Sequence, residues 1–175
     1  MAKSIYYKFK VLCVLLSCFY SVFASATTEE TVKLNIEFNL PDLAVTPYHR
    51  PYVAVWLETL QREHVTTISL WADDLEWHKD LRQWWRKAGD EKIDGVTGAT
   101  RRPGKYQIKW LGFDEKQRVI EDGEYYLNIE VVREEGGRNY FRKKIYLGQL
   151  QQYELKSKTE LQAIKINTFV KSNKE

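Results

Sequence analysis

Apolar residues recur at every second position in short runs of this chain, and this alternation constrains the fold more than any other feature. In the first run, Val32, Leu34, Ile36 and Phe38 alternate with polar residues, and the run stops before Pro41. A period of two places all the apolar side chains on one face of an extended strand. The run therefore predicts a half-buried β-strand, and the 14% content of aromatic residues favours strands as well.

Six further runs have the length and the composition of strands. The complete set of predicted strands covers residues 32–38, 52–58, 65–71, 105–111, 125–133, 140–147 and 161–169. A short polar turn around residues 61–64 separates the second strand from the third, which predicts a hairpin. Short strands in this number are typical of a sandwich. We therefore expect a mainly β fold, an immunoglobulin-like β-sandwich of about seven strands.

One segment, at about 74–88, has a helical period instead. Its apolar residues at helical spacing are Trp77, Leu81, Trp84, Trp85 and Ala88. The segment begins with Asp73-x-x-Glu76 and is followed by Gly89, which are residues typical of helix ends. We expect one amphipathic helix inserted into the sandwich. Its tryptophans have two interpretations: they pack the helix onto a sheet, or they form a platform for a planar ligand.

The first 26 residues have the order of a secretory signal peptide. Lys3, Lys8 and Lys10 precede an apolar run, and the small residues 24–26 follow it. The apolar run is shorter than the roughly 20 residues that a membrane-spanning helix needs. We expect cleavage after Ala26, a periplasmic location, and one immunoglobulin-like domain over residues 27–175. A second interpretation stays open, because residues 15–18 resemble a lipobox that would make Cys18 the lipidated first residue of a lipoprotein.

Removal of this leader changes two properties of the chain. Cys13 and Cys18 both lie within it, so the mature chain would contain no disulfide and no thiolate metal site. The leader carries three lysines and no acid, so the formal net charge falls from +3 to zero. The remaining basic groups, Arg101-Arg102 and residues 142–144, are short and far apart. The sequence therefore does not favour a nucleic-acid partner.

Signatures of hydrolytic and metal-dependent enzymes are missing from the sequence. It contains no Gly-x-Ser-x-Gly motif, and its histidines, His49, His64 and His78, fall in three different predicted elements. No His-x-x-x-His pair or carboxylate cluster has the spacing of a metal site. We identify no catalytic residue and no metal ligand.

The segment Asp94-Gly-Val-Thr-Gly-Ala-Thr100 lies between the predicted helix and the strand that begins at Lys105. It resembles the Asp-x-x-Ser/Thr-Gly-Ala-Thr motif of bacterial proteins that carry covalent FMN. Flavin subunits of sodium-pumping NADH:quinone oxidoreductase and of Rnf-type complexes belong to this group. The resemblance implies a phosphoester between FMN and Thr100, made by an exported FAD:protein FMN transferase. Many such domains have Ser or Thr two residues after the acceptor, whereas this chain has Arg102.

The residues of this segment suit the implied modification. Gly98 and Ala99 are small, so another molecule can approach the backbone closely and the chain can bend sharply. Thr97 is the Ser/Thr of the motif, and Asp94 is able to hold the turn or dock against the metal of the transferase. Arg101, with Arg102 and Lys105, would place guanidinium and ammonium groups near a phosphate. Trp84, Trp85 and Tyr106 are candidates for stacking on the flavin ring.

Motifs along most of the chain resemble a family of secreted bacterial proteins known as domain of unknown function 2271. They are Arg50–Trp56, Leu70-Trp71, Asp80–Arg86, Asp94–Arg101, Pro103–Tyr106 and Trp110. The resemblance implies a periplasmic immunoglobulin-like domain, sometimes encoded near PepSY-type membrane proteins and flavin transferases. We therefore expect a periplasmic flavoprotein that transfers electrons between a PepSY-type membrane reductase and an extracytoplasmic acceptor.

Two other functions remain open at this stage. The tryptophans are also compatible with a non-enzymatic module that engages a polysaccharide or a partner protein. The chain is equally compatible with an accessory subunit of a membrane complex that has the family fold and no cofactor. Burial of the tryptophans would argue against the first of these alternatives.

Overall fold

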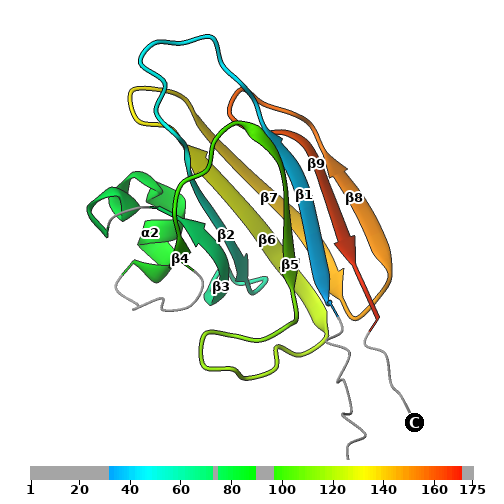
Figure 1. Ribbon diagram of the computed structural model, residues 1–175. Helices are drawn as coiled ribbons and strands as arrows, with labels where there is room; N and C mark the ends of the chain where they lie inside the picture. Colours follow the sequence, from blue (N-terminus) through cyan, green and yellow to red (C-terminus); the bar gives the residue numbers. More distant parts are fainter. Residues whose placement is uncertain (1–31, 73–74, 90–96, 171–175) are drawn as a thin grey trace, which may run out of the picture. The chain divides into compact units, whose positions relative to one another are not determined.

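The computed structural model describes residues 32–72, 75–89 and 97–170 (Figure 1). In these ranges the chain forms two β-sheets, so the predicted mainly β sandwich is confirmed. The strands are β1 (Leu34–Leu40), β2 (Tyr52–Glu58), β3 (His64–Trp71), β4 (Thr97–Gly98), β5 (Gly104–Trp110), β6 (Gly123–Val132), β7 (Arg138–Leu147), β8 (Gln151–Leu155) and β9 (Gln162–Thr168). The predicted leader, residues 1–26, and the predicted cap residue Asp73 lie outside the described residues. No helix in the described ranges is long and apolar enough to cross a membrane.

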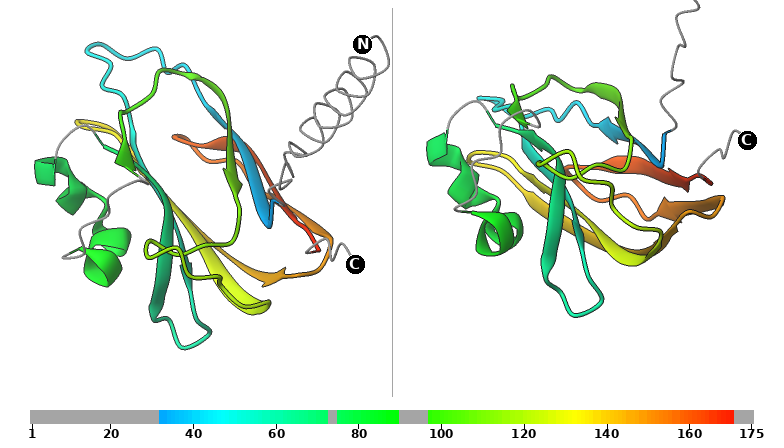
Figure 2. Two further views of the ribbon diagram at one scale, coloured as in Figure 1. Left: turned by 60° about the horizontal axis from the view of Figure 1, so that its bottom comes forward. Right: turned by 90° about the horizontal axis from the view of Figure 1, so that it is seen from below.

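The four-stranded sheet has the order β5-β1-β9-β8, and the five-stranded sheet has the order β4-β3-β2-β6-β7. Neighbouring strands are antiparallel, except that β4 runs parallel to β3. The two sheets face each other as layers, as Figure 2 shows. Between β4 and β5 the chain passes from the edge of one sheet to the edge of the other. This crossing contains the end of the motif found in the sequence.

The main core lies between the two sheets and is built from the alternating residues. On β1, Leu34, Ile36 and Phe38 are at most 2% exposed, whereas Glu37 between them is exposed. They pack in one cluster with inward-facing residues of β2, β6 and β9. Burial of such side chains contributes about 25 cal/mol for each Å² of apolar surface removed from water. The alternation in the sequence therefore corresponds to the inner face of the sandwich.

Strand β2 is buried at every position, which alternation alone does not predict. Its second face is covered by a helical layer, visible beside β2 and β3 in Figure 1. Leu81, Trp84 and Ala88 of this layer pack in one cluster with Ala54 and Trp56 of β2. The Trp84 indole also donates a hydrogen bond of 3.0 Å to Thr67 Oγ1. Trp84 thus packs the helical layer onto the sheet, as the first interpretation of the tryptophans predicts.

The helical layer extends over residues 75–88 but is not one continuous α-helix. It consists of a 3-10 helix, η1 (Leu75–Asp80), and an α-helix, α2 (Arg82–Ala88). Leu81 between them has φ −76° and ψ 65°, which is not helical. The start of α2 is capped by a carboxylate from β6, because the amides of Gln83 and Trp84 each donate to Glu130 Oε2 at 2.9 Å. This tertiary cap begins a new helix at the place where the sequence pattern predicts continuity.

Two strands were not predicted from the sequence. β8 is an edge strand of the four-stranded sheet, and its residues Gln151–Leu155 are mostly polar and only partly buried. β4 contains two residues, which is too short for any alternation to be seen. Hydrogen bonding to a neighbouring strand defines both elements, and the sequence pattern carries little sign of it.

The loop between β5 and β6 is organised by Asp114. Its Oδ1 accepts hydrogen bonds from the amides of Lys116 and Arg118, at 2.9 and 2.8 Å, and its Oδ2 accepts one from Arg118 Nε at 2.7 Å. Burial alone would raise the pKa of Asp114. The hydrogen bonds from Arg118 and Lys116 favour the ionised carboxylate, and they lower this pKa below its ordinary value.

The lowered pKa of Asp114 predicts a pH-dependent contribution to stability. Ionised Asp114 stabilises the fold above the unfolded-state pKa of about 3.9, and this contribution is lost as the pH falls through the lower folded-state pKa. Asp114→Asn is therefore expected to unfold at a lower urea concentration than the wild type at pH 7. The difference is expected to shrink below about pH 3. Urea unfolding at both pH values tests this, and a difference independent of pH would contradict it.

Candidate functional site

The described part of the motif, residues 97–100, lies at the edge of the five-stranded sheet, and together with Arg101 we refer to it as the edge segment. Thr97 pairs with Leu70, and Gly98 pairs with Trp71, in the short parallel ladder between β4 and β3. The amide of Ala72 also donates a hydrogen bond of 2.9 Å to the Gly98 carbonyl. The remaining motif residue, Asp94, lies outside the described residues. The structure thus places Thr97, Gly98, Ala99, Thr100 and Arg101 together on one edge.

Exposure changes abruptly within the edge segment. Thr97, Gly98 and Ala99 are exposed, whereas Thr100 is only 7% exposed. The phosphoester that the motif implies needs a Thr100 hydroxyl that another enzyme can reach. In this conformation the segment presents its backbone at 97–99 and keeps the Thr100 side chain covered.

Gly98 is not required by the fold. It lies in an extended strand rather than in the sharp bend expected from the sequence, and its φ is outside the left-handed region. A β-carbon added at this position would meet no atom within 4 Å. Neither backbone conformation nor internal packing therefore explains a glycine here. A small residue at an exposed edge leaves room for the close approach of another molecule.

An aromatic cluster of Phe38, Trp71 and Tyr106 lies beneath the edge segment. The ring centroids of Trp71 and Tyr106 are 5.3 Å apart, and those of Phe38 and Trp71 are 5.5 Å apart. The Arg101 guanidinium carbon lies 4.0 Å from the centroid of the Trp71 ring and 5.3 Å from that of Tyr106. This geometry is a cation–π contact. The residue after Thr100 is therefore held in place by a tryptophan of β3.

Tyr106 of β5 contacts Arg101, the last residue of the edge segment, and Arg102 after it. Its hydroxyl donates a hydrogen bond of 2.6 Å to the Arg102 carbonyl, while its ring belongs to the aromatic cluster. Of the three residues expected to stack on a flavin ring, Tyr106 is the one placed beside the segment. The other two residues lie in the helical layer. Trp84 is 1% exposed there, Trp85 is half-buried, and the centroids of the Trp84 and Trp85 rings are 6.3 Å apart.

The sequence did not identify Trp71 as part of this site. Its backbone pairs with Gly98, and the Arg101 guanidinium lies over its ring. In the sequence Trp71 looks like the end of a buried strand, and it is indeed only 3% exposed. No local pattern predicts that residues 30 positions apart in a chain will stack. Only the parallel pairing of β4 with β3 brings them together.

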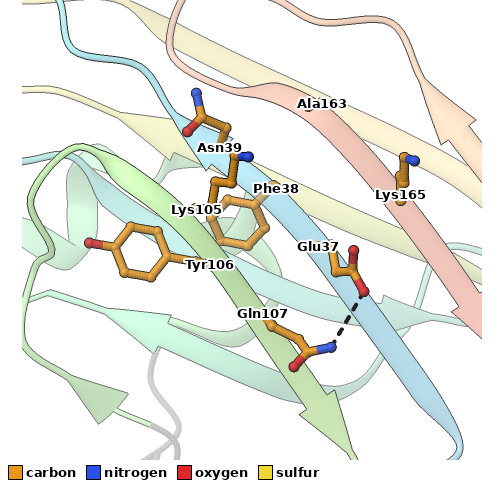
Figure 3. A pocket seen from close by; sticks show the side chains of 8 residues that line it. All are labelled: Glu37, Phe38, Asn39, Lys105, Tyr106, Gln107, Ala163 and Lys165. Carbon is orange, nitrogen blue, oxygen red and sulfur yellow. Dashed lines mark hydrogen bonds between the residues drawn. The ribbon is translucent and has the colours of Figure 1, made fainter.

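A groove of about 480 Å³ adjoins this region on the outer face of the four-stranded sheet (Figure 3). Its polar side chains come from β1, β5 and β9 and their flanks: Glu37, Asn39, Lys105, Gln107 and Lys165. Gln107 donates a hydrogen bond of 3.4 Å to Glu37. Lys105 lines the groove and follows the end of the edge segment, Arg101, by four residues. The groove offers hydrogen-bonding groups, the positive charges of Lys105 and Lys165, and the negative charge of Glu37.

None of the three histidines belongs to the edge segment or lines the groove. His49 is near two carboxylates, Nδ1 lying 3.4 Å from Glu134 Oε2. His64 is hydrogen-bonded to Thr67 at 3.0 Å, and His78 is buried against Trp84. In the described part of the chain, no three residues of the types His, Cys, Asp and Glu are grouped as metal ligands.

Four of the six tryptophans cannot form a surface platform. Trp56, Trp71, Trp84 and Trp110 are between 0 and 8% exposed. Trp77 and Trp85 are half-buried, and both pack against the cluster beneath the helical layer. The aromatic side chains therefore serve mainly the core, which argues against a binding module built on an aromatic platform.

Fold and site together define a β-sandwich protein with a helical layer and a basic segment at one sheet edge. Residues 33–163 match the family described as "Predicted periplasmic protein (DUF2271)". Because this match covers most of the 175 residues, the chain belongs to that family. Family membership and periplasmic location, both expected from the sequence, are thereby confirmed. No curated protein and no solved structure matches the chain.

Proposed function

We propose that this protein is a periplasmic flavoprotein, with FMN joined to Thr100 through a phosphoester. It passes electrons from a PepSY-type membrane reductase to an extracytoplasmic acceptor. The observation that carries the proposal is Gly98, which the fold does not require, two residues before Thr100 within a motif that resembles an FMN attachment site. A transferase that binds closely over the edge segment would explain why position 98 is a glycine, which has no side chain to obstruct it.

The charges around the edge segment suit a phosphate. Arg101 and Arg102 are exposed, and Lys105 is exposed at the start of β5. A phosphodiester on Thr100 carries one negative charge, which a neighbouring guanidinium stabilises through charge-assisted hydrogen bonds. Arg101 is already oriented by its contact with Trp71. Tyr106, which is half-buried and lies beside Arg101, is the aromatic ring that we expect to contact the flavin.

The attachment chemistry is a transfer from FAD. The Thr100 hydroxyl oxygen forms a bond to the phosphorus of the FMN half, the phosphoanhydride bond of FAD breaks, and AMP leaves. The hydroxyl proton passes to a base of the transferase. Once attached, the flavin supplies reversible uptake of electrons, and the protein supplies anchoring, position and electrostatics. A covalent link also prevents loss of the cofactor outside the cytoplasm.

Intact-mass spectrometry tests this function. The mature protein would be produced in the periplasm with and without an FAD:protein FMN transferase. With the transferase, we expect its mass to increase by one FMN less one water, accompanied by flavin absorbance that survives denaturation. An unchanged mass in the presence of an active transferase, shown by a second substrate protein in the same cells, would contradict the proposal.

A further inference from the structure

Two contacts with the end of β3 lie on either side of Thr100. On the N-terminal side, Gly98 pairs with the backbone of Trp71. On the C-terminal side, Arg101 lies over the ring of the same tryptophan. Thr100 lies between these contacts and is 7% exposed. A transferase needs the hydroxyl oxygen at its own reaction centre, which this covered conformation does not provide.

The first contact is slight. β4 has two residues, lies at the edge of the sheet and has one neighbouring strand. Beyond this two-residue ladder, one backbone hydrogen bond, from Ala72 to Gly98, extends the pairing. Short exposed edge elements open at a much lower free energy than the core strands of the same domain. The Thr97 and Gly98 side of the segment can therefore leave β3 while the sandwich stays folded.

The second contact is also separable from the core. Arg101 is exposed, and a cation–π contact at an exposed site is weak compared with the burial of a core side chain. Trp71, by contrast, is packed in the main core with Phe38 and residues of both sheets. If the guanidinium leaves, the ring keeps its own packing. Both contacts with Trp71 can thus break without disturbing β3.

We propose that Thr100 receives FMN only in an open form, in which residues 97–101 have detached from Trp71 and the rest of the sandwich remains folded. This inference rests on the proposed function and adds how the site is reached. The closed form holds the segment against β3, and the transferase captures the open one. Contacts with Trp71 therefore set the rate of modification from outside the motif.

The test compares two buried tryptophans of the same core cluster. Trp71→Leu removes the ring under Arg101 and leaves the motif unchanged. Trp110→Leu removes a similar side chain from the four-stranded sheet and is the matched control. Purified mature proteins would be incubated with transferase, FAD and Mg²⁺, and the rate of FMN addition followed by intact mass. We expect Trp71→Leu to be modified about two- to fivefold faster than the wild type, because the cation–π contact is lost.

The outcomes separate the two proposals. Equal acceleration in Trp71→Leu and Trp110→Leu would mean that loss of global stability controls the rate, and would overturn local opening. Equal rates in Trp71→Leu and the wild type would overturn it as well, while leaving the flavin function intact. Absence of FMN from every variant would overturn both proposals.

Hydrogen exchange of the wild-type protein gives a second measurement that needs neither a variant nor FMN. The Ala72 amide donates to Gly98, so its exchange reports detachment of the segment. We expect it to exchange at least about tenfold faster than the amides of the central strand β2. Exchange of Ala72 as slow as that of β2 would show that the segment opens only on global unfolding, and would overturn the proposal.

Discussion

Replacement of Thr100 by valine is expected to abolish covalent FMN incorporation completely. Valine retains the shape of threonine but has a methyl group in place of the hydroxyl, whose oxygen would form the phosphoester. Because Thr100 is 7% exposed, this choice preserves packing better than alanine would. Loss of a buried hydroxyl contact is expected to cost no more than about 1–2 kcal/mol of folding free energy. Intact mass after co-expression with the transferase measures the incorporation, and urea unfolding measures the stability.

Thr97→Ser is the matched control for this variant. Thr97 is the other threonine of the edge segment, it is exposed, and the motif accepts serine at its position. We expect Thr97→Ser to carry FMN as the wild type does. If Thr100→Val carried the same added mass as the wild type, Thr100 would not be the acceptor.

Replacement of Glu130 by alanine is expected to cause the largest loss of stability among these variants. The Glu130 side chain is fully buried. It accepts hydrogen bonds from the amides of Gln83 and Trp84 and from Arg138, whose Nε is 2.7 Å from Oε1. Alanine would leave the start of α2 uncapped and Arg138 without its carboxylate. Breaking a buried ionic pair of this kind costs roughly 3–5 kcal/mol.

The control for Glu130 lies on the same strand. Glu124 forms an ion pair of 2.8 Å with Lys144, and both side chains are nearly half exposed. Exposed pairs contribute less than about 1 kcal/mol, because water and salt screen them. Urea unfolding should therefore separate Glu130→Ala clearly from Glu124→Ala. Equal losses in the two variants would refute the capping role assigned to Glu130.

The strands were predictable where one face of the strand is buried in the core and the other face is exposed to solvent. Leu34, Ile36 and Phe38 show this alternation in the sequence and line the core in the structure. β8 was not predictable, because its polar residues pair at an edge and bury little apolar surface. The break in the helical layer was also hidden, because the carboxylate that caps α2 comes from Glu130, far along the chain.

Part of the candidate site was likewise predictable from the sequence, and part was not. The motif itself identifies Thr97, Gly98, Ala99 and Thr100 from the sequence. The partner that holds them, Trp71, was hidden because a parallel pairing between β3 and β4 brings it to Gly98. The burial of Thr100 was hidden for the same reason: exposure depends on how the segment packs, and residue type alone does not determine it.

Peptide mapping of the mature protein, produced with an active transferase, tests the central claim most directly. Cleavage after Lys92 and Arg101 releases a peptide of residues 93–101, whose only hydroxyl side chains are Thr97 and Thr100. We predict that this peptide carries one FMN less one water, and that its fragment ions place the added mass on Thr100. An unmodified peptide, or one modified on Thr97, would contradict the assignment of Thr100 as the flavin-carrying residue.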